Sequence, residues 1–293
     1  QREDDTQACH VPSSLGMDLR GGSVAGVQTC IEVPSFGLLL DIGSCSTTAV
    51  NLPRVLVSHG HLDHVGAITQ HAARRALMKM GESTYFLPRS IARDAEALFH
   101  AAGALDGQVI PRHLVPLEPG EDFPLAEKRW VRPFPTFHRV PSQGYTIWER
   151  RHRLRSEFQG KPPSDLAELR RRSVVLDEPY DAAILSFTGD TRIEVLEQVP
   201  ELRHTDTLII ETTFLDKRIT PAEAHEMGHI HLDDLLARAE LLTAKSIILH
   251  HFSARYAEGE AERIVRTRLP DALRSRVRVF PPPKPMHART DIP

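Results

Sequence analysis

The chain has 293 residues, of which 41% are hydrophobic, and a formal net charge of −3 at pH 7. This length and apolar content can form one large α/β domain or two smaller ones, and we favour a single domain over residues 1–293. The small net charge excludes a general attraction to nucleic acid, so any polyanion would have to be held by local basic patches.

The cysteines and the N-terminal segment bear on the cellular compartment. Cys9, Cys30 and Cys45 are odd in number and lack C-x-x-C spacing, which argues against a disulfide framework and against a cysteine zinc site. No apolar run approaches the roughly 18 residues that a membrane span needs, and QREDDTQACHV does not resemble a signal peptide. We expect an intracellular protein, in the cytoplasm, with the nucleus or an organelle left open. Whether Gln1 is the native N-terminus also stays open.

The predicted elements alternate between strands and helices. Short strands rich in Val, Ile and Leu are expected within 29–44 and 54–64, followed by a helix over 65–80. A strand at 84–90, a helix at 91–105 and a strand-rich region to about 143 come next. Later strands are expected within 182–192, 206–216 and 244–256, with a helix over 231–244. This order predicts an α/β fold with polar, reactive side chains at strand ends.

Residues 149–173 interrupt the pattern. The segment ERRHRLRSEFQGKPPSDLAELRRRS carries seven arginines and one lysine against four acids. Its two halves, separated by Gly-Lys-Pro-Pro, predict a short, basic, protruding helical arm. Two interpretations stay open, a solvated surface hairpin and an arm that contacts nucleic acid. Residues 281–293 begin with PPPKP and are expected to form an exposed Pro-rich tail.

The stretch SHGHLDH gathers metal-binding side chains directly after a predicted strand. Its four candidates are His59, His61, Asp63 and His64. The first two are two positions apart on extended chain and point to the same side, and the following turn can bring the others back toward them. Such a cluster suits Zn²⁺, with Mn²⁺ or Fe as alternatives.

Four candidates exceed the three protein ligands of a usual catalytic zinc, which predicts two metal ions and further ligands elsewhere. The candidates at later strand ends are His138, Asp190 and His251. The alternative is that these are surface histidines gathered by chance. This alternative is stronger for His138 or His251 taken alone than for the first four residues as a set.

These residues carry a resemblance. SHGHLDH matches the H-x-H-x-D-H motif of the metallo-β-lactamase superfamily, and FTGDT, ETTFLD and HHFSARY resemble its ribonuclease Z branch, the tRNA 3′-processing endonucleases, in their short plant-type form. The similarity extends from about Ala25 to Phe280. It implies an αββα four-layer sandwich, commonly a homodimer, and a zinc-dependent endoribonuclease that removes the 3′ trailer of precursor tRNA.

The resemblance also implies residue roles. One metal would be held by His59, His61 and His138, the other by Asp63, His64 and His251, with Asp190 bridging. Asp63 would also orient the attacking water or accept its proton, and Asp41 would support a histidine ligand.

Glu211 and His229 match the family's pair near the leaving 3′ oxygen. We prefer His229 to His231 because it lies 22 positions before His251, the spacing that the family motif implies. Without the resemblance, Glu211 would be interpreted as a surface acid at a strand end and His229 as a loop histidine.

The substrate contacts are less defined. Arg255 could bind phosphate or pair with an acid. The arm residues expected to hold the tRNA backbone are Arg150, Arg151, Arg153, Lys161 and Arg170 to Arg172. The chain has GSCSTTA where many family members have a Glu-Gly-Thr-Gln run, and its arm is short. The alternatives are therefore a hydrolase with the same metals that acts on a small phosphodiester or lactone, and an RNA-binding relative without activity.

Overall fold

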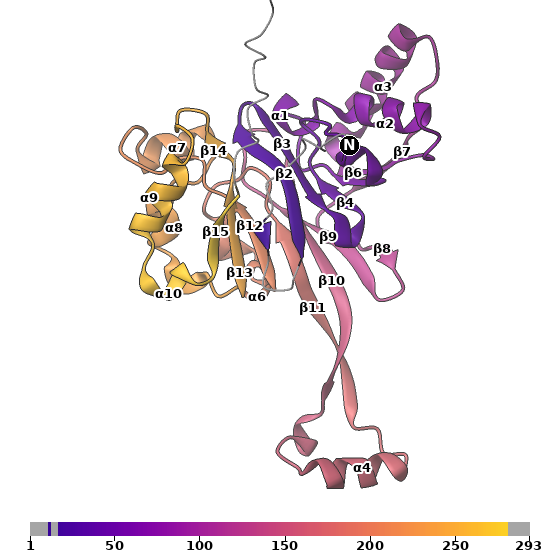
Figure 1. Cartoon of the computed structure of the whole chain (residues 1–293), viewed down its shortest axis with the longest axis vertical. Coiled ribbons are helices and arrows are strands. Elements are labelled where there is room, and N and C mark those ends of the chain that lie inside the picture. Colours follow the sequence, from indigo (N-terminus) through magenta and orange to yellow (C-terminus); the bar gives the residue numbers. More distant parts are fainter. Residues whose placement is uncertain (1–10, 13–16, 281–293) are drawn as a thin grey trace, which may run out of the picture.

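Two β-sheets pack face to face, with helices on the outer side of each (Figure 1). This computed structural model describes residues 11–12 and 17–280, so Cys9 and the expected tail at 281–293 lie outside the described residues. The first sheet contains β1 (Val11–Pro12), β2 (Asp18–Ala25), β3 (Gln28–Val33), β4 (Leu38–Leu40), β5 (Arg54–Leu56), β6 (Thr84–Pro88) and β7 (His113–Leu117) in that order, with β14 (Phe252–Ser253) beside β2. The second contains, in spatial order, β15 (Val277–Val279), β13 (Ser246–His250), β12 (Thr207–Glu211), β11 (Asp177–Phe187), β10 (Gln143–Leu154), β9 (Arg129–Pro135) and β8 (Phe123–Ala126).

Helices connect and cover these sheets. The α-helices are α1 (Leu62–Val65), α2 (Ile68–Leu77), α3 (Ala92–Asp106), α4 (Pro163–Arg171), α5 (Val195–Gln198), α6 (Glu201–His204), α7 (Pro221–Met227), α8 (Leu232–Leu236), α9 (Glu260–Arg268) and α10 (Asp271–Arg274). Short 3-10 turns are η1 (Pro34–Phe36), η2 (Ala49–Asn51), η3 (Arg89–Ile91), η4 (Ser156–Phe158) and η5 (Ala239–Leu241). None of the helices within 17–280 has the length and apolarity to cross a membrane.

Three apolar clusters fill the spaces between the four layers. Successive side chains of a strand point to opposite faces, so neighbouring residues enter different clusters. In β4, Leu38 and Leu40 face the second sheet, whereas Leu39 packs with residues of α2 and α3. In β12, Ile209 faces the first sheet and Leu208 packs with residues of the outer helices α5, α6, α8, α9 and α10. The expected αββα sandwich is confirmed.

The carboxyl ends of several strands meet at one edge of the sandwich. β4 to β7 run parallel in the first sheet, and β11, β12 and β13 run parallel in the second. An isolated bridge between His59 and Ser142 joins the two sheets there. Loops that leave these strands can therefore combine their side chains in a single site.

The arm is a β-hairpin with a helical tip, and not a helical arm throughout (Figure 1). β10 and β11 stay paired as far as Leu154 and Asp177, and α4 lies at the far end. The helix expected in the first half of 149–173 was wrong because its residues pair with a strand that starts beyond the segment. The ion pairs Arg150–Asp181 and Arg153–Glu178 join the two strands.

Stacked aromatic and cationic side chains stabilise the root of this hairpin. Trp130 of β9 and Trp148 of β10 have ring centroids 6.5 Å apart and an interplanar angle of 9°. The Arg150 guanidinium lies 5.7 Å from the Trp130 ring centroid, and that of Arg132 lies 5.4 Å from Trp148. Cation–π contacts of this kind add to the strand pairing and stabilise the paired part of β10 and β11, which we call the stalk of the arm.

One other element departs from expectation. The helix predicted over 231–244 ends at Leu236, and η5 follows it. The Arg276 guanidinium donates to the carbonyl oxygens of Leu242 and Ala244, at 2.8 and 2.7 Å, so these carbonyls are held outside a helix by a residue more than thirty positions away.

Candidate metal centre

The histidines and aspartates singled out by their position after strands come together at the shared edge. His59 follows β5, His138 follows β9, Asp190 follows β11 and His251 follows β13. His61, Asp63 and His64 come from the tight turn that starts α1. Four strand ends from two sheets thus contribute to one site.

The first ligand group contains His59, His61, His138 and Asp190, whose donor atoms lie within 4.8 Å of one another. His59 Nε2 lies 3.0 Å and His138 Nε2 lies 3.3 Å from His61 Nδ1. Nitrogens that share one tetrahedral zinc at about 2.0–2.1 Å are roughly 3.3 Å apart. The spacing of these atoms therefore fits a common ion.

The second ligand group contains Asp63, His64 and His251. Their facing atoms are separated by 3.2 Å for the two Nε2 atoms, 3.5 Å for His251 Nε2 to Asp63 Oδ2, and 3.6 Å for His64 Nε2 to Asp63 Oδ2.

Asp190 lies between the two groups. Its Oδ2 is 3.3 Å from His64 Nε2 and 3.8 Å from His59 Nε2. Its Oδ1 is buried and has no hydrogen-bond partner among the described residues. A buried carboxylate oxygen without a partner is costly, and a bound cation would satisfy it.

Hydrogen bonds behind the ring nitrogens orient the histidines. Asp41 accepts from His64 Nδ1 at 2.6 Å and from the backbone N–H and hydroxyl of Ser58 at 2.7 and 2.8 Å. His138 Nδ1 donates to the carbonyl oxygen of Gly228 at 2.8 Å. The contacts of His64 with Asp41 and of His138 with Gly228 each place a proton on Nδ1 of the histidine and leave its Nε2 free to coordinate a metal. Asp41 thus contacts His64 on the side opposite its Nε2 atom, and its role in supporting a metal ligand stays a prediction.

Burial and charge set the protonation of the cluster. Burial lowers the pKa of His59, His61 and His138, which keeps these imidazoles neutral and available as ligands at pH 7. Burial would lower the pKa of His64 too, but Asp190 and Asp41 together raise it. Burial would raise the pKa of Asp190, yet His251 and His64 hold it well below its ordinary value.

Two site residues have left-handed backbone. Asp41 has φ 58° and His251 has φ 62°, a region that non-glycine residues rarely adopt. Such conformations cost of the order of 1–3 kcal/mol and persist where the surroundings fix them.

Glu211 and His229 form a pair beside the clusters. His229 Nδ1 lies 2.9 Å from Glu211 Oε1 and 4.0 Å from Asp190 Oδ2. Burial alone would lower the pKa of His229, but the Glu211 carboxylate outweighs it and raises the pKa to about 9. The end of α7 sets this position: Gly228 adopts φ 83°, and a Cβ there would come within 2.8 Å of His138 Nδ1. The helix therefore stops where His229 must turn toward Glu211.

Comparison with known proteins places the chain in a family. The beta-lactamase superfamily domain matches residues 46–252. The chain is 34% identical over 264 residues to tRNase Z TRZ1 of Arabidopsis thaliana, which covers 89% of this chain and 94% of that protein. The chain belongs to the ribonuclease Z family. It is also 35% identical over 159 residues to nuclear ribonuclease Z of Triticum aestivum, covering 54% of this chain and 90% of that protein.

Solved structures agree on the fold. Human tRNase Z, short form, superposes with a TM-score of 0.56 at 19% identity and covers 80% of this chain and 92% of that one. The metallo-β-lactamase fold protein YhfI from Bacillus subtilis gives a TM-score of 0.59 at 15% identity, covering 89% and 94%. Superfamily membership and the His/Asp clusters together indicate a metal-binding site.

His231, two positions after His229, lies in a different environment. His231 is buried, and its Nδ1 accepts from the backbone N–H of Asp233 at 3.0 Å as the N-cap of α8. Its Nε2 lies 3.2 Å from the carbonyl oxygen of Asp216. Both nitrogens are occupied by backbone groups, so His231 is a structural residue.

The basic residues of the arm divide into paired and unpaired groups. Arg150 pairs with Asp181, Arg151 with Glu149 and Asp206, Arg153 with Glu178, and Arg170 more loosely, at 3.7 Å, with Asp177. In the described part of the chain, no acid lies within ion-pair distance of Lys161, Arg171 or Arg172, all exposed near α4. None of these residues belongs to the ligand groups.

Two exposed arginines lie near the centre. Arg255 is exposed, no acid of residues 17–280 lies within ion-pair distance of it, and its charge contributes to the lowered pKa of Glu223. Arg139, which follows His138 directly, was not predicted. It is exposed, it likewise has no acid partner in the part of the chain described, and its charge contributes to the lowered pKa of His61.

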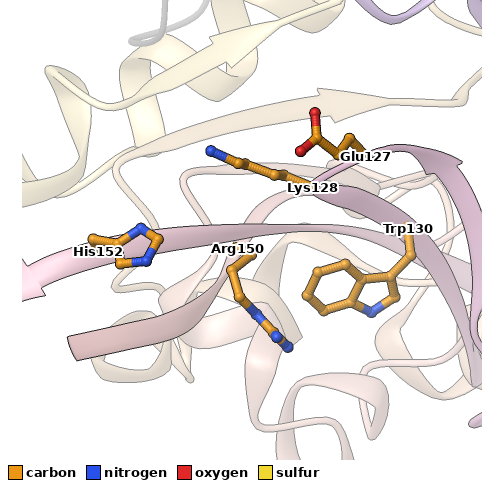
Figure 2. A pocket seen from close by; sticks show the side chains of 5 residues that line it. All are labelled: Glu127, Lys128, Trp130, Arg150 and His152. Atoms are coloured by element: carbon orange, nitrogen blue, oxygen red, sulfur yellow. The ribbon is translucent and has the colours of Figure 1, made fainter.

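A surface hollow lies away from the ligand groups, at the root of the arm. Figure 2 shows its lining residues Glu127, Lys128, Trp130, Arg150 and His152. Lys128 lies in the turn between β8 and β9, His152 lies in β10, and Arg150 lies beside the Trp130 ring. Because both Trp130 and Arg150 already belong to the stack that braces the stalk, this hollow is a structural feature of the arm.

Proposed function

We propose that this chain is a zinc-dependent endoribonuclease that removes the 3′ trailer of precursor tRNA by phosphodiester hydrolysis at two metal ions. The observation that carries this proposal is that the pair Glu211 and His229 adjoins two ligand groups with Asp190 between them. The names of the similar proteins, tRNase Z and ribonuclease Z, support precursor tRNA as the substrate.

The ligands divide as the resemblance implies. His59, His61 and His138 would hold one ion, Asp63, His64 and His251 the other, and Asp190 both. Imidazole and carboxylate donors suit Zn²⁺, with Mn²⁺ or Fe as the alternatives for the same set. Such a pair of ions supplies a water that ionises near neutral pH and positive charge that stabilises an in-line displacement at phosphorus.

Asp63 and His229 would handle the protons. Asp63 Oδ2 is anchored by the backbone N–H of Gly26 at 2.8 Å, which positions the carboxylate to orient the attacking water and accept its proton. Glu211 accepts from His229 Nδ1 and keeps that imidazole protonated. As the bond from phosphorus to the 3′ oxygen breaks, His229 Nε2 would donate its proton to that oxygen. The products would be a tRNA with a 3′-hydroxyl and a trailer with a 5′-phosphate.

The arm would hold the tRNA backbone. The unpaired cations Lys161, Arg171 and Arg172 are free to contact phosphates, whereas Arg150, Arg151 and Arg153 would contribute mainly by keeping the hairpin in shape. Arg170, with its loose partner, could do either. Arg255 would contact a phosphate near the site. By resemblance we further propose a homodimer inside the cell, with the cytoplasm as the expected compartment. Relatives named chloroplastic and nuclear support an intracellular site.

The test is cleavage of an end-labelled precursor tRNA by the zinc-loaded protein, with Asp190→Ala as the control and the cut position mapped. We expect one metal-dependent cut just after the discriminator base and none with the control. A protein that leaves precursor tRNA intact but hydrolyses a small phosphodiester or a lactone would be the alternative hydrolase.

A further inference from the structure

We propose that the Thr213 hydroxyl is a positioning group that couples the metal centre to the acid pair. Thr213 is buried, two residues beyond the last residue of β12. Its Oγ1 lies 2.6 Å from Glu211 Oε2, 3.1 Å from His251 Nδ1 and 3.3 Å from His229 Nδ1. The inference rests on the proposed function, since it assigns a role within that site.

Proton accounting fixes the direction of these contacts. A hydroxyl has one proton and two lone pairs, and an ionised carboxylate can only accept. The shortest contact, to Glu211, therefore takes the Thr213 proton. The lone pairs of Oγ1 then face His251 and His229, whose Nδ1 atoms must both carry hydrogen.

For His251 this direction decides which nitrogen can bind metal. A proton on Nδ1 leaves the lone pair on Nε2, the atom that lies 3.2 Å from His64 Nε2 and 3.5 Å from Asp63 Oδ2. The reverse arrangement would place the proton on Nε2 and point it into the ligand group. Thr213 thereby selects the coordinating form of His251.

Without the hydroxyl, another acceptor would take over. Asp190 Oδ1 lies 3.3 Å from His251 Nδ1 and has no hydrogen-bond partner in the described residues. A hydrogen bond from His251 to this oxygen would draw Asp190 away from the ligand groups. Loss of the hydroxyl should therefore weaken metal binding as well as disturb Glu211.

Without the Thr213 hydroxyl, Glu211 would lose its shortest hydrogen bond but keep its position. Its Oε2 would keep the backbone N–H groups of Thr213 and Ile230, each at 3.2 Å, and its Oε1 would keep Thr191 N and His229 Nδ1, each at 2.9 Å. The acid pair should thus survive in a less constrained form, and the metal effect should dominate.

The test compares three variants of the full chain. Thr213→Val removes the hydroxyl at nearly constant shape, and Thr213→Ser keeps it. Thr212→Val is the matched control, because the adjacent Thr212 is also buried and its hydroxyl has no partner in the described region. Zinc affinity is measured by competition with a chromogenic chelator, a readout that needs no RNA cleavage and stays informative even if precursor tRNA is not the substrate.

We expect Thr213→Val to bind zinc about 10–100-fold more weakly, the usual range for loss of such a supporting contact, with Thr213→Ser and Thr212→Val within about threefold of wild type. Equal affinities for Thr213→Val and Thr213→Ser, or an equal loss in Thr212→Val, would overturn the proposal. Should Thr213→Val not fold, long-range ¹H–¹⁵N spectra of zinc-loaded wild type replace it: His251 bound through Nε2 with its proton on Nδ1 supports the proposal, and His251 bound through Nδ1 or not bound overturns it.

Discussion

Removal of the three unpaired cations near α4 should lower the salt dependence of tRNA binding. Lys161, Arg171 and Arg172 have no acidic partner in the described residues, so each can replace one counterion on a phosphate. The slope of log K against log salt changes by about 0.7–0.9 per phosphate contact, so their replacement by alanine should reduce it by roughly 2–3. Between 50 and 200 mM salt, the affinity of both proteins should fall, and the factor by which it falls should be about 15–60 times smaller for the variant than for the wild type.

The assay is filter binding or fluorescence anisotropy with labelled precursor tRNA and the inactive Asp190→Ala background at four salt concentrations. The matched control is Arg150→Ala with Arg153→Ala, since both arginines already pair with acids across the hairpin. An unchanged slope in the triple variant, or an equal change in the control, would refute the division of the arm into a bracing stalk and a binding tip.

Three further predictions concern the site and the core. Replacement of His229 by alanine should lower kcat for precursor tRNA by about 10²–10⁴-fold, the usual contribution of general acid catalysis, and should hardly affect bis(4-nitrophenyl) phosphate, whose leaving group needs no proton; equal losses on both substrates would contradict a role as acid. Asp41→Asn should weaken zinc binding about 10–100-fold in a chelator competition, because the amide oxygen must face the backbone N–H of Ser58 and the amide NH2 then meets His64 Nδ1 in place of an acceptor; unchanged affinity would contradict it. Burial lowers the pKa of His71 to about 4, below its ordinary value near 6.5, so the unfolded chain binds the proton more readily. The free energy of unfolding therefore decreases as the pH is lowered from about 6.5 to about 4. Urea unfolding of zinc-free wild type should therefore show about 2 kcal/mol more loss between pH 8 and pH 5 than His71→Gln shows, and parallel curves would refute this.

Much of the site could be predicted because its residues follow strands. A short apolar run followed by SHGHLDH identifies both a strand and the chemistry after it, and the same pattern recurs before Asp190 and His251. The carboxyl ends of parallel strands meet at one edge, so residues far apart in sequence become neighbours there. The fold class followed from the same alternation together with the family resemblance.

The remainder depends on pairings that local sequence does not contain. The first half of the arm has helix-forming composition, yet it is a strand because Asp181 and Glu178 face Arg150 and Arg153 across the hairpin. Thr213 is one of many threonines in the sequence, and only the loop geometry after β12 brings its hydroxyl to two histidines. Side-chain partners of this kind are fixed by tertiary structure, so periodicity and motif spacing cannot identify them.

The arm and the acid pair should affect different kinetic constants. A phosphate bound at the tip of the arm would lie far from the metal centre, so its contact would be the same in the ground state and in the transition state and would contribute to KM (Figure 1). In the proposed mechanism the Glu211–His229 pair would act on charge that develops only as the 3′ oxygen leaves, so it would contribute to kcat. A variant of the arm tip and a variant of the acid pair should therefore combine additively in free energy, since the ion pair at the tip, Arg170 with Asp177, shares no residue with the pair Glu211 and His229. Non-additive losses would mean that the arm also sets the position of the scissile phosphate.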